Sequence, residues 1–270
     1  MHEMPKGPGW LHWVDLASPD AATSKSFYCE LFGWSVYTLT APGYGDYNIF
    51  TLDDVHGPEV AGMQMLTDDS QPPSWTCYFR VDDLQGTVDT IVSQGGQELV
   101  PPTDWAGLAD MALCADSQGV DFGIAKPGLI KGLGATNQPS AVCWVELAAR
   151  DVSEGRRFYT EVFGWRATDR DYSGSVYTTW KVDDWSIGGM ALMDDAWPSQ
   201  YPAQWTPCFW VTDCDATAAR ATELGAAVGV PPTDIQPGRF SKLTDPTGAP
   251  FAVITPVRTP GPDQRSDPGR

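Results

Sequence analysis

Few side chains in this protein are of the kinds that bind a metal ion or attack a substrate. Histidine is scarce, and His12 and His56 are the candidates for a metal site. His56 lies in a turn near Asp53, Asp54 and Glu59, whose carboxylates could hold a hard cation loosely or could simply face solvent. An iron or zinc site with two histidines would have to be assembled from His12 and His56. The alternative for His12 is a structural role in a strand.

Nucleophilic and phosphate chemistry have no motif in the sequence. There is no G-x-S-x-G turn, no glycine-rich phosphate loop after a strand and no dinucleotide-binding fingerprint. Glu30 and Glu161 occupy matching positions of a repeated helix, so we interpret them as structural rather than as a paired acid and base. The six cysteines form no C-x-x-C pair, which is typical of reduced core thiols in a cytoplasmic protein.

The composition indicates a globular protein with a large core. The chain has 270 residues, of which 42% are hydrophobic and 12 are tryptophan, enough for two compact domains. A formal charge of -18 argues against nucleic acid or an anionic membrane as a partner. We see no signal peptide and no apolar run long enough to span a membrane, so a cytoplasmic location is expected.

An internal repeat organises the chain. The stretch FYCELFGW at residues 27–34 returns as FYTEVFGW at residues 158–165, 131 positions later. Three further residue types recur at the same offset: Trp13 with Trp144, Leu16 with Leu147, and Asp20 with Asp151. A run of matches in one register predicts a duplicated structural unit.

Each copy of the repeat contains two smaller units of the same kind. Residues 10–17 alternate in polarity as a strand does, Asp20 follows as a helix start, and Gly33 is typical of a helix end. Three more strands are expected by residue 66, and the same βαβββ order follows at residues 75–125. We therefore predict an α+β fold of four βαβββ units. The expected divisions are domain 1 at 1–130, a linker at 131–140, domain 2 at 141–257 and a disordered tail at 258–270.

These features resemble the vicinal oxygen chelate superfamily, which includes glyoxalase I, extradiol dioxygenases and bleomycin-resistance proteins. The resemblance is carried by the paired units, the F-Y-x-x-x-F-G-W helix end and the D-x-x-G sequence before the last strand of each domain. It implies two tandem domains whose mixed sheets curl into cups. The chain is most similar to two-domain actinobacterial members often labelled hydroxylases, some of which accompany aromatic polyketide or anthracycline pathways.

The enzymatic members of this superfamily hold a divalent metal with His, Glu or Gln side chains from the first and last strands of each unit. The matching positions in this sequence are Trp13, Thr76, Gly123, Trp144, Thr206 and Ala252. The fourth-strand position falls near Met63 or Gln64 in one half and near Met190 or Ala191 in the other. Gln64 alone is a plausible ligand. We therefore expect no metal, no other cofactor and no catalytic residue of the family type.

Strand alternation predicts a second, less apolar face on each sheet. Its aromatic side chains would stack on a planar molecule while a few polar groups orient it. The residues predicted to bind a ligand there are Trp13, Asp15, Thr76, Tyr78, Arg80, Trp144, Glu146 and Trp210. Met63 and Met65 are expected to add adaptable surface, and the loop residues Trp105, Trp185 and Trp197 to close over the site.

The leading interpretation is a metal-free binding protein for a planar aromatic natural product or antibiotic, with an anthracycline-like polyketide as one candidate. It would serve sequestration, resistance or accessory biosynthesis, and the carboxylates would favour a cationic amino sugar. One alternative is a metal-dependent lyase, dioxygenase or hydroxylase with an atypical site that uses His12, His56 or Glu146. Another is a protein whose cups are filled by its own side chains. The protein is expected to be a monomer or a homodimer.

Overall fold

The computed structural model describes residues 7–41, 45–68, 70–172, 175–195, 197 and 201–257. The predicted tail at 258–270 lies outside these residues. Within the described part of the chain, no helix is both long enough and apolar enough to cross a membrane.

Domain 1 contains two βαβββ units that share one sheet. Its elements are β1 (Leu11–Ser18), α1 (Ala21–Phe32), β2 (Ser35–Ala41), β3 (Gly45–Thr51), β4 (Glu59–Met65), β5 (Ser74–Arg80), α2 (Leu84–Ser93), β6 (Gln97–Asp104), β7 (Ala109–Ala115) and β8 (Asp121–Pro127). The strand order is β2-β3-β4-β1-β5-β8-β7-β6. Strands β1 and β4 pair in parallel, as do β5 and β8, and the other neighbours are antiparallel.

Domain 2 repeats this order. Its elements are β9 (Val142–Ala149), α3 (Val152–Phe163), β10 (Arg166–Tyr172), β11 (Ser175–Val182), β12 (Trp185–Leu192), β13 (Gln204–Trp210), α4 (Cys214–Glu223), β14 (Ala227–Ile235), β15 (Gly238–Thr244) and β16 (Pro250–Pro256). The strand order β10-β11-β12-β9-β13-β16-β15-β14 is that of domain 1. The predicted α+β fold of four βαβββ units in two tandem domains is confirmed.

Local signals at the ends of the repeated helices agree with the expected boundaries. Asp20 caps α1 by accepting backbone N–H groups of the first turn, and Asp151 does the same for α3. Gly33 and Gly164 end these helices with φ of 71° and 68°, a left-handed conformation that disfavours side chains.

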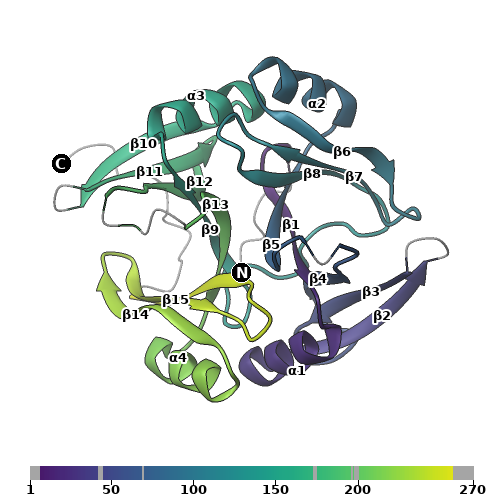
Figure 1. The fold of residues 1–270 in the computed structure, drawn as a ribbon, viewed down its shortest axis with the longest axis vertical. Coiled ribbons are helices and arrows are strands. Elements are labelled where there is room, and N and C mark those ends of the chain that lie inside the picture. Colours follow the sequence, from purple (N-terminus) through teal and green to yellow (C-terminus); the bar gives the residue numbers. More distant parts are fainter. Residues whose placement is uncertain are drawn as a thin grey trace.

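The two sheets curve away from each other. In Figure 1 their central strands β1, β5, β9 and β13 lie near the middle of the molecule, while the outer strands curl to opposite sides. Helix α1 lies beside α4, and α2 lies beside α3. We call the side of each sheet that is covered by helices and by the other domain its convex face, and the opposite side its cup.

Helices α1 and α3 each pack against the sheet of the other domain. Phe32 of α1 lies with its ring centroid 5.1 Å from that of Phe209 on β13. The ring centroids of Phe163 on α3 and Phe79 on β5 are likewise 5.5 Å apart. The FYxxxFGW stretch was predicted to mark a helix end, and the packing shows that its aromatic side chains belong to a core that both domains share.

Tyrosine–carboxylate hydrogen bonds also join the two domains in both directions. The buried Tyr28 hydroxyl donates to Asp245 Oδ2 at 2.9 Å and accepts from Trp75 Nε1 at 2.9 Å. Asp245 belongs to the D-x-x-G turn of domain 2, where its other oxygen accepts three backbone N–H groups. Tyr159 and Asp116 form the reciprocal bond at 3.0 Å.

The segment predicted to be a linker is packed against domain 1. Its backbone N–H groups at Leu133 and Gly134 donate to the carbonyl oxygens of His12 and Glu59 at 2.9 and 2.7 Å. Leu133 is buried, and so is Ile130 just before the segment. The connection therefore extends the wall of domain 1 as well as joining the domains.

Removing the Tyr28 hydroxyl should destabilise the whole protein. In Tyr28→Phe, Trp75 Nε1 loses its acceptor and Asp245 loses a donor at a buried site, so the free energy of unfolding should fall by about 1–3 kcal/mol. Tyr159→Phe should lose a similar amount, and the double variant should lose about the sum because the two sets of hydrogen bonds share no residue. Urea denaturation followed by circular dichroism measures these changes.

Tyr37→Phe is the control, because it removes a hydroxyl that bonds Glu59 outside the interface. Equal losses for Tyr37→Phe and Tyr28→Phe would contradict the importance given to the interdomain bond.

Candidate functional site

A chain of three side chains lies at the base of the domain 1 cup. Trp13 Nε1 donates to the Tyr47 hydroxyl at 2.8 Å, and that hydroxyl donates to Asp15 Oδ1 at 2.7 Å. Trp13 and Asp15 share the cup face of β1 because they are two positions apart, while Tyr47 comes from β3. All three side chains are buried.

The same arrangement recurs in domain 2. Trp144 Nε1 donates to the Tyr177 hydroxyl at 2.9 Å, and Tyr177 is hydrogen-bonded in turn to Glu146. We call each Trp–Tyr–carboxylate set a relay. Burial and the neighbouring carboxylate raise the pKa of Tyr177 well above its usual value, so its hydroxyl keeps its proton.

Glycine makes room for both relays. A Cβ atom on Gly62 would lie 1.8 Å from the Tyr47 hydroxyl, and one on Gly189 would lie 2.0 Å from that of Tyr177. Neither tyrosine and neither glycine was identified from the sequence. The sequence did contain a signal for them, because Tyr47 recurs as Tyr177 and the pair Gly62-Met63 recurs as Gly189-Met190. These offsets are slightly shorter than the 131 positions of the main repeat.

The domain 1 cup is filled by its own side chains. Its residual cavity measures about 10 Å³, which is close to the space that one water molecule needs. Trp105 lies edge-on to Tyr47 with ring centroids 4.2 Å apart, and Ile130 closes another side. The expected closure by Trp105 therefore occurs, but it leaves no space for a polycyclic ligand in this conformation.

Asp15 is a buried carboxyl group with no ion-pair partner among the described residues. Burial raises its pKa to about 7, and the hydrogen bond from Tyr47 offsets only part of that rise. Burial and the nearby Asp15 raise the pKa of Tyr47 as well. Between about pH 4 and pH 7 this relay therefore holds a proton that an exposed carboxyl group would release.

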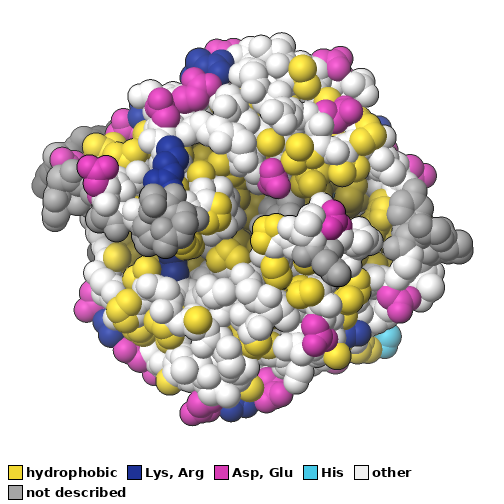
Figure 2. Space-filling model, in the orientation of Figure 1, with side chains coloured by type: hydrophobic (Ala, Val, Ile, Leu, Met, Phe, Trp, Pro, Cys, Tyr) yellow, Lys and Arg dark blue, Asp and Glu magenta, His cyan; other side chains and the backbone are white. Residues whose placement is uncertain are grey.

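The domain 2 cup is more accessible and contains a cation. Trp144 and Tyr177 are only partly buried. Lys242 Nζ on β15 forms an ion pair with Glu146 Oε1 at 2.9 Å and lies 4.8 Å from the ring centroid of Trp197. Figure 2 shows apolar side chains recessed on both sides of the molecular centre, with basic side chains at the edge of one recess. The preference for a cationic ligand expected from Glu146 does not fit this cup, because Lys242 already pairs with that carboxylate.

Other predicted site residues lie in different places. Register pairs Met63 with Leu16 and Met65 with Ser18, so both methionines lie on the convex face and their prediction as cup residues is wrong. The parallel register with β1 decides which face these side chains occupy, since a shift of one residue exchanges the two faces. Met65 Sδ instead accepts the N–H of Ala21 at the start of α1.

The remaining predicted residues lie at several different places. Thr76 and Tyr78 pair with Asp15 and Trp13 on the cup face of domain 1. Arg80, at the end of β5, forms an ion pair with Asp82, and Trp210 is partly buried at the end of β13. Trp185 packs on Trp10 rather than over a cup.

The donor set does not fit the metal site of the family. Trp13, Thr76, Trp144 and Thr206 occupy positions where nitrogen or carboxylate ligands would be needed. In the described part of the chain, no group of three or more His, Cys, Asp or Glu side chains is arranged to hold a metal ion. His12 is buried beside the filled cup of domain 1, whereas His56 is exposed in the turn between β3 and β4.

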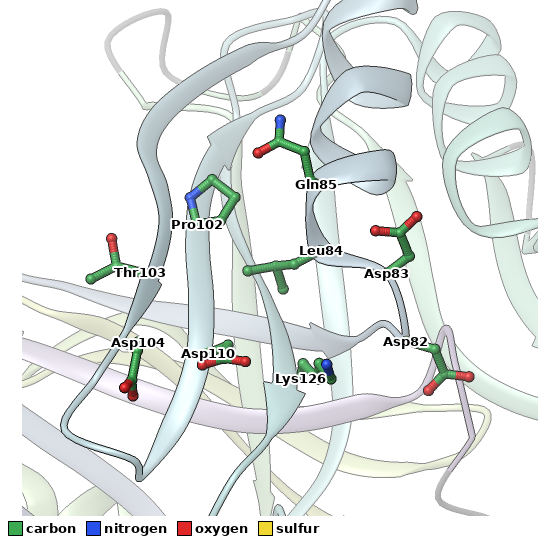
Figure 3. Close-up of a pocket in the computed structure, with 9 residues that line it drawn as sticks. All are labelled: Asp82, Asp83, Leu84, Gln85, Pro102, Thr103, Asp104, Asp110 and Lys126. Carbon is green, nitrogen blue, oxygen red and sulfur yellow. The ribbon is translucent and has the colours of Figure 1, made fainter.

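One surface cleft in domain 1 is lined mainly by polar side chains. Figure 3 shows carboxylates gathered between the start of α2 and the β6–β7 hairpin, around a cleft of about 340 Å³. Two of them have structural partners, since Asp83 accepts the N–H of Gly86 and Asp104 accepts that of Gly107. We assign this cleft no ligand.

Sequence comparisons identify the class of protein. Residues 10–124 match the family described as the Glyoxalase/Bleomycin resistance protein/Dioxygenase superfamily, and residues 144–254 match the Glyoxalase-like domain. The chain belongs to this superfamily, as its resemblance to the vicinal oxygen chelate proteins predicted.

Individual relatives extend over nearly the whole chain. It is 34% identical over 258 residues to the anthracycline biosynthesis protein DauV of Streptomyces sp. (strain C5), an alignment that covers 92% of this chain and 93% of DauV. It is 34% identical over 252 residues to the putative glyoxylase CFP32 of Mycobacterium tuberculosis (strain CDC 1551 / Oshkosh), covering 92% and 95%. The 2,3-dioxygenase LapB from Pseudomonas sp. KL28 shares the fold, with a TM-score of 0.63 at 14% identity over 95% of each chain.

The raised pKa of Asp15 predicts a pH dependence of stability. Its carboxyl group titrates near 3.8 when the chain is unfolded and near 7 when it is folded, so the folded protein holds an extra proton between these values. The free energy of unfolding therefore loses on the order of 4 kcal/mol from this group as the pH rises from about 4 to 7. Asp15→Asn should remove that loss.

Urea denaturation of the wild type and of Asp15→Asn at pH 5 and pH 8 measures the difference. The variant should gain stability relative to the wild type at pH 8. A wild type and a variant that lose stability equally between the two pH values would show that Asp15 is ionised in the folded protein.

Proposed function

We propose that this protein binds a planar aromatic small molecule in the domain 2 cup and serves as an accessory or sequestering protein in aromatic natural-product metabolism. The main support is the group Trp144, Tyr177, Glu146 and Lys242, which places flat rings beside fixed polar groups on a partly exposed face. Broad rings provide stacking area and isolated polar groups provide orientation. The name of the relative DauV, an anthracycline biosynthesis protein, suggests a polycyclic aromatic ligand.

Binding fits the side chains of this chain better than metal-dependent catalysis does. The positions that would coordinate the metal carry Trp and Thr in both domains. The relays are hydrogen-bonded through tyrosine hydroxyls, which burial keeps protonated. They are therefore suited to orienting phenol or ketone oxygens on a bound ring system.

The difference between the cups suggests one ligand per chain. Trp105 and Ile130 occupy the space in domain 1 where a ligand would lie. Domain 2 has Trp144 and Tyr177 partly exposed at the equivalent place. We therefore assign the binding site to domain 2 and a supporting role to the cup of domain 1.

Titration with the sugar-free tetracyclic aglycone of doxorubicin tests this function. We expect quenching of tryptophan fluorescence that saturates at one ligand per chain. Trp144→Phe should weaken binding by about tenfold, since losing part of a stacked ring and its N–H costs about 1.4 kcal/mol. Trp13→Phe is the matched control, because Trp13 occupies the same place in the filled cup.

Unchanged affinity in Trp144→Phe together with weakened binding in Trp13→Phe would move the site to domain 1. Elemental analysis of the purified protein is a companion measurement. Stoichiometric iron, zinc, nickel or manganese whose removal abolishes turnover would replace the proposed function by a metal-dependent enzyme.

A further inference from the structure

The ion pair between Lys242 and Glu146 is unusually well buried for this protein. Their side chains are 13% and 19% exposed, whereas the acid of every other ion pair among the described residues is at least 31% exposed. A buried ion pair is weak evidence for stability, because desolvation of the two charges offsets most of their attraction. A binding role would account for placing both charges inside an aromatic cup.

Domain 1 has no lysine at the position that Lys242 occupies in domain 2. Lys242 on β15 pairs with Ala252 on β16. In domain 1 the corresponding pair joins Leu113 on β7 to Gly123 on β8. Leucine therefore stands where domain 2 has lysine, although both cups contain the relay. The lysine is therefore one chemical difference between the filled cup and the accessible one.

Lys242 is placed to donate a hydrogen bond to a ligand. An ammonium group has three donors, and the described structure gives one of them to Glu146 Oε1. The centroid of the Trp197 ring lies 4.8 Å from Lys242 Nζ. This cation–π contact stabilises the charge and is not a conventional hydrogen bond to a lone-pair acceptor. Trp144 and Phe240 pack around the apolar cluster on the same face. A flat ligand stacked there can place an oxygen against Lys242.

We infer that Lys242 makes the domain 2 cup selective for planar aromatic molecules with an acidic oxygen, such as a carboxylate or a phenol or enol beside a ketone. This rests on the proposed function and sharpens it. The ion pair is neutral before the ligand arrives, so an anionic oxygen gains a donor at Lys242. A ligand ammonium group meets a like charge there and has to displace Lys242 from Glu146.

Three anthraquinones of similar size test the selectivity: anthraquinone-2-carboxylate, 2-methylanthraquinone and 2-(aminomethyl)anthraquinone. Their dissociation constants are measured at pH 7.5 by fluorescence quenching and by calorimetry. The wild type should bind the carboxylate at least tenfold more tightly than the amine, with the neutral compound between them. In Lys242→Met this ratio should fall to one or invert, because Glu146 then lacks its cation.

Lys126→Met is the matched control, since it removes one positive charge from the polar cleft of domain 1 and should keep the wild-type ratio. If Lys242→Met does not fold, the double variant Lys242→Met/Glu146→Gln removes both buried charges and should show a ratio near one.

Each remaining outcome has a definite meaning. The inferred selectivity is overturned if the wild type binds the carboxylate no more tightly than the amine, or if Lys242→Met leaves the ratio of these affinities unchanged. In either case, saturable binding of the anthraquinones still supports the proposed function. Failure of all three anthraquinones to bind at millimolar concentration overturns both.

Discussion

Helices α1 and α3 bury their aromatic faces against the sheet of the other domain, and this exchange determines the rest of the architecture. Each helix carries a tyrosine whose hydroxyl bonds a carboxylate of the opposite domain, Tyr28 with Asp245 and Tyr159 with Asp116. Each domain leaves part of its aromatic helix face and one carboxylate oxygen of its D-x-x-G turn to be covered by the other domain. The convex faces are therefore joined, and both cups must open away from the interface.

Duplication within this frame has produced two cups with different properties. Both keep the Trp–Tyr–carboxylate relay and the glycine beneath the tyrosine. Domain 1 encloses Asp15 behind Trp105 and Ile130, whereas domain 2 keeps Glu146 partly exposed and pairs it with Lys242. A shared scaffold thus supports one packed cup and one more accessible cup that contains an ion pair.

Much of the fold could be predicted because the repeat and the strand alternation are local patterns. The alternation placed Trp13 and Asp15, and likewise Trp144 and Glu146, on the face opposite the helices, as observed. It failed for Met63 and Met65, because β4 pairs in parallel with β1 and local polarity does not determine that register. Tyr47 and Tyr177 were missed for the same reason, since they join the site from another strand.

The sequence alone determined the four units and the capped helix ends, because each depends on residue types at short spacing. Together with the family resemblance, it also showed that Trp and Thr stand at the positions of the usual metal ligands. Only the tertiary structure decided which cup is filled and which contains a cation. Lys242 lies 96 positions from Glu146, and Ile130 enters domain 1 from the connection between domains. Such contacts depend on strand order and chain path, which bring together residues that no local pattern relates.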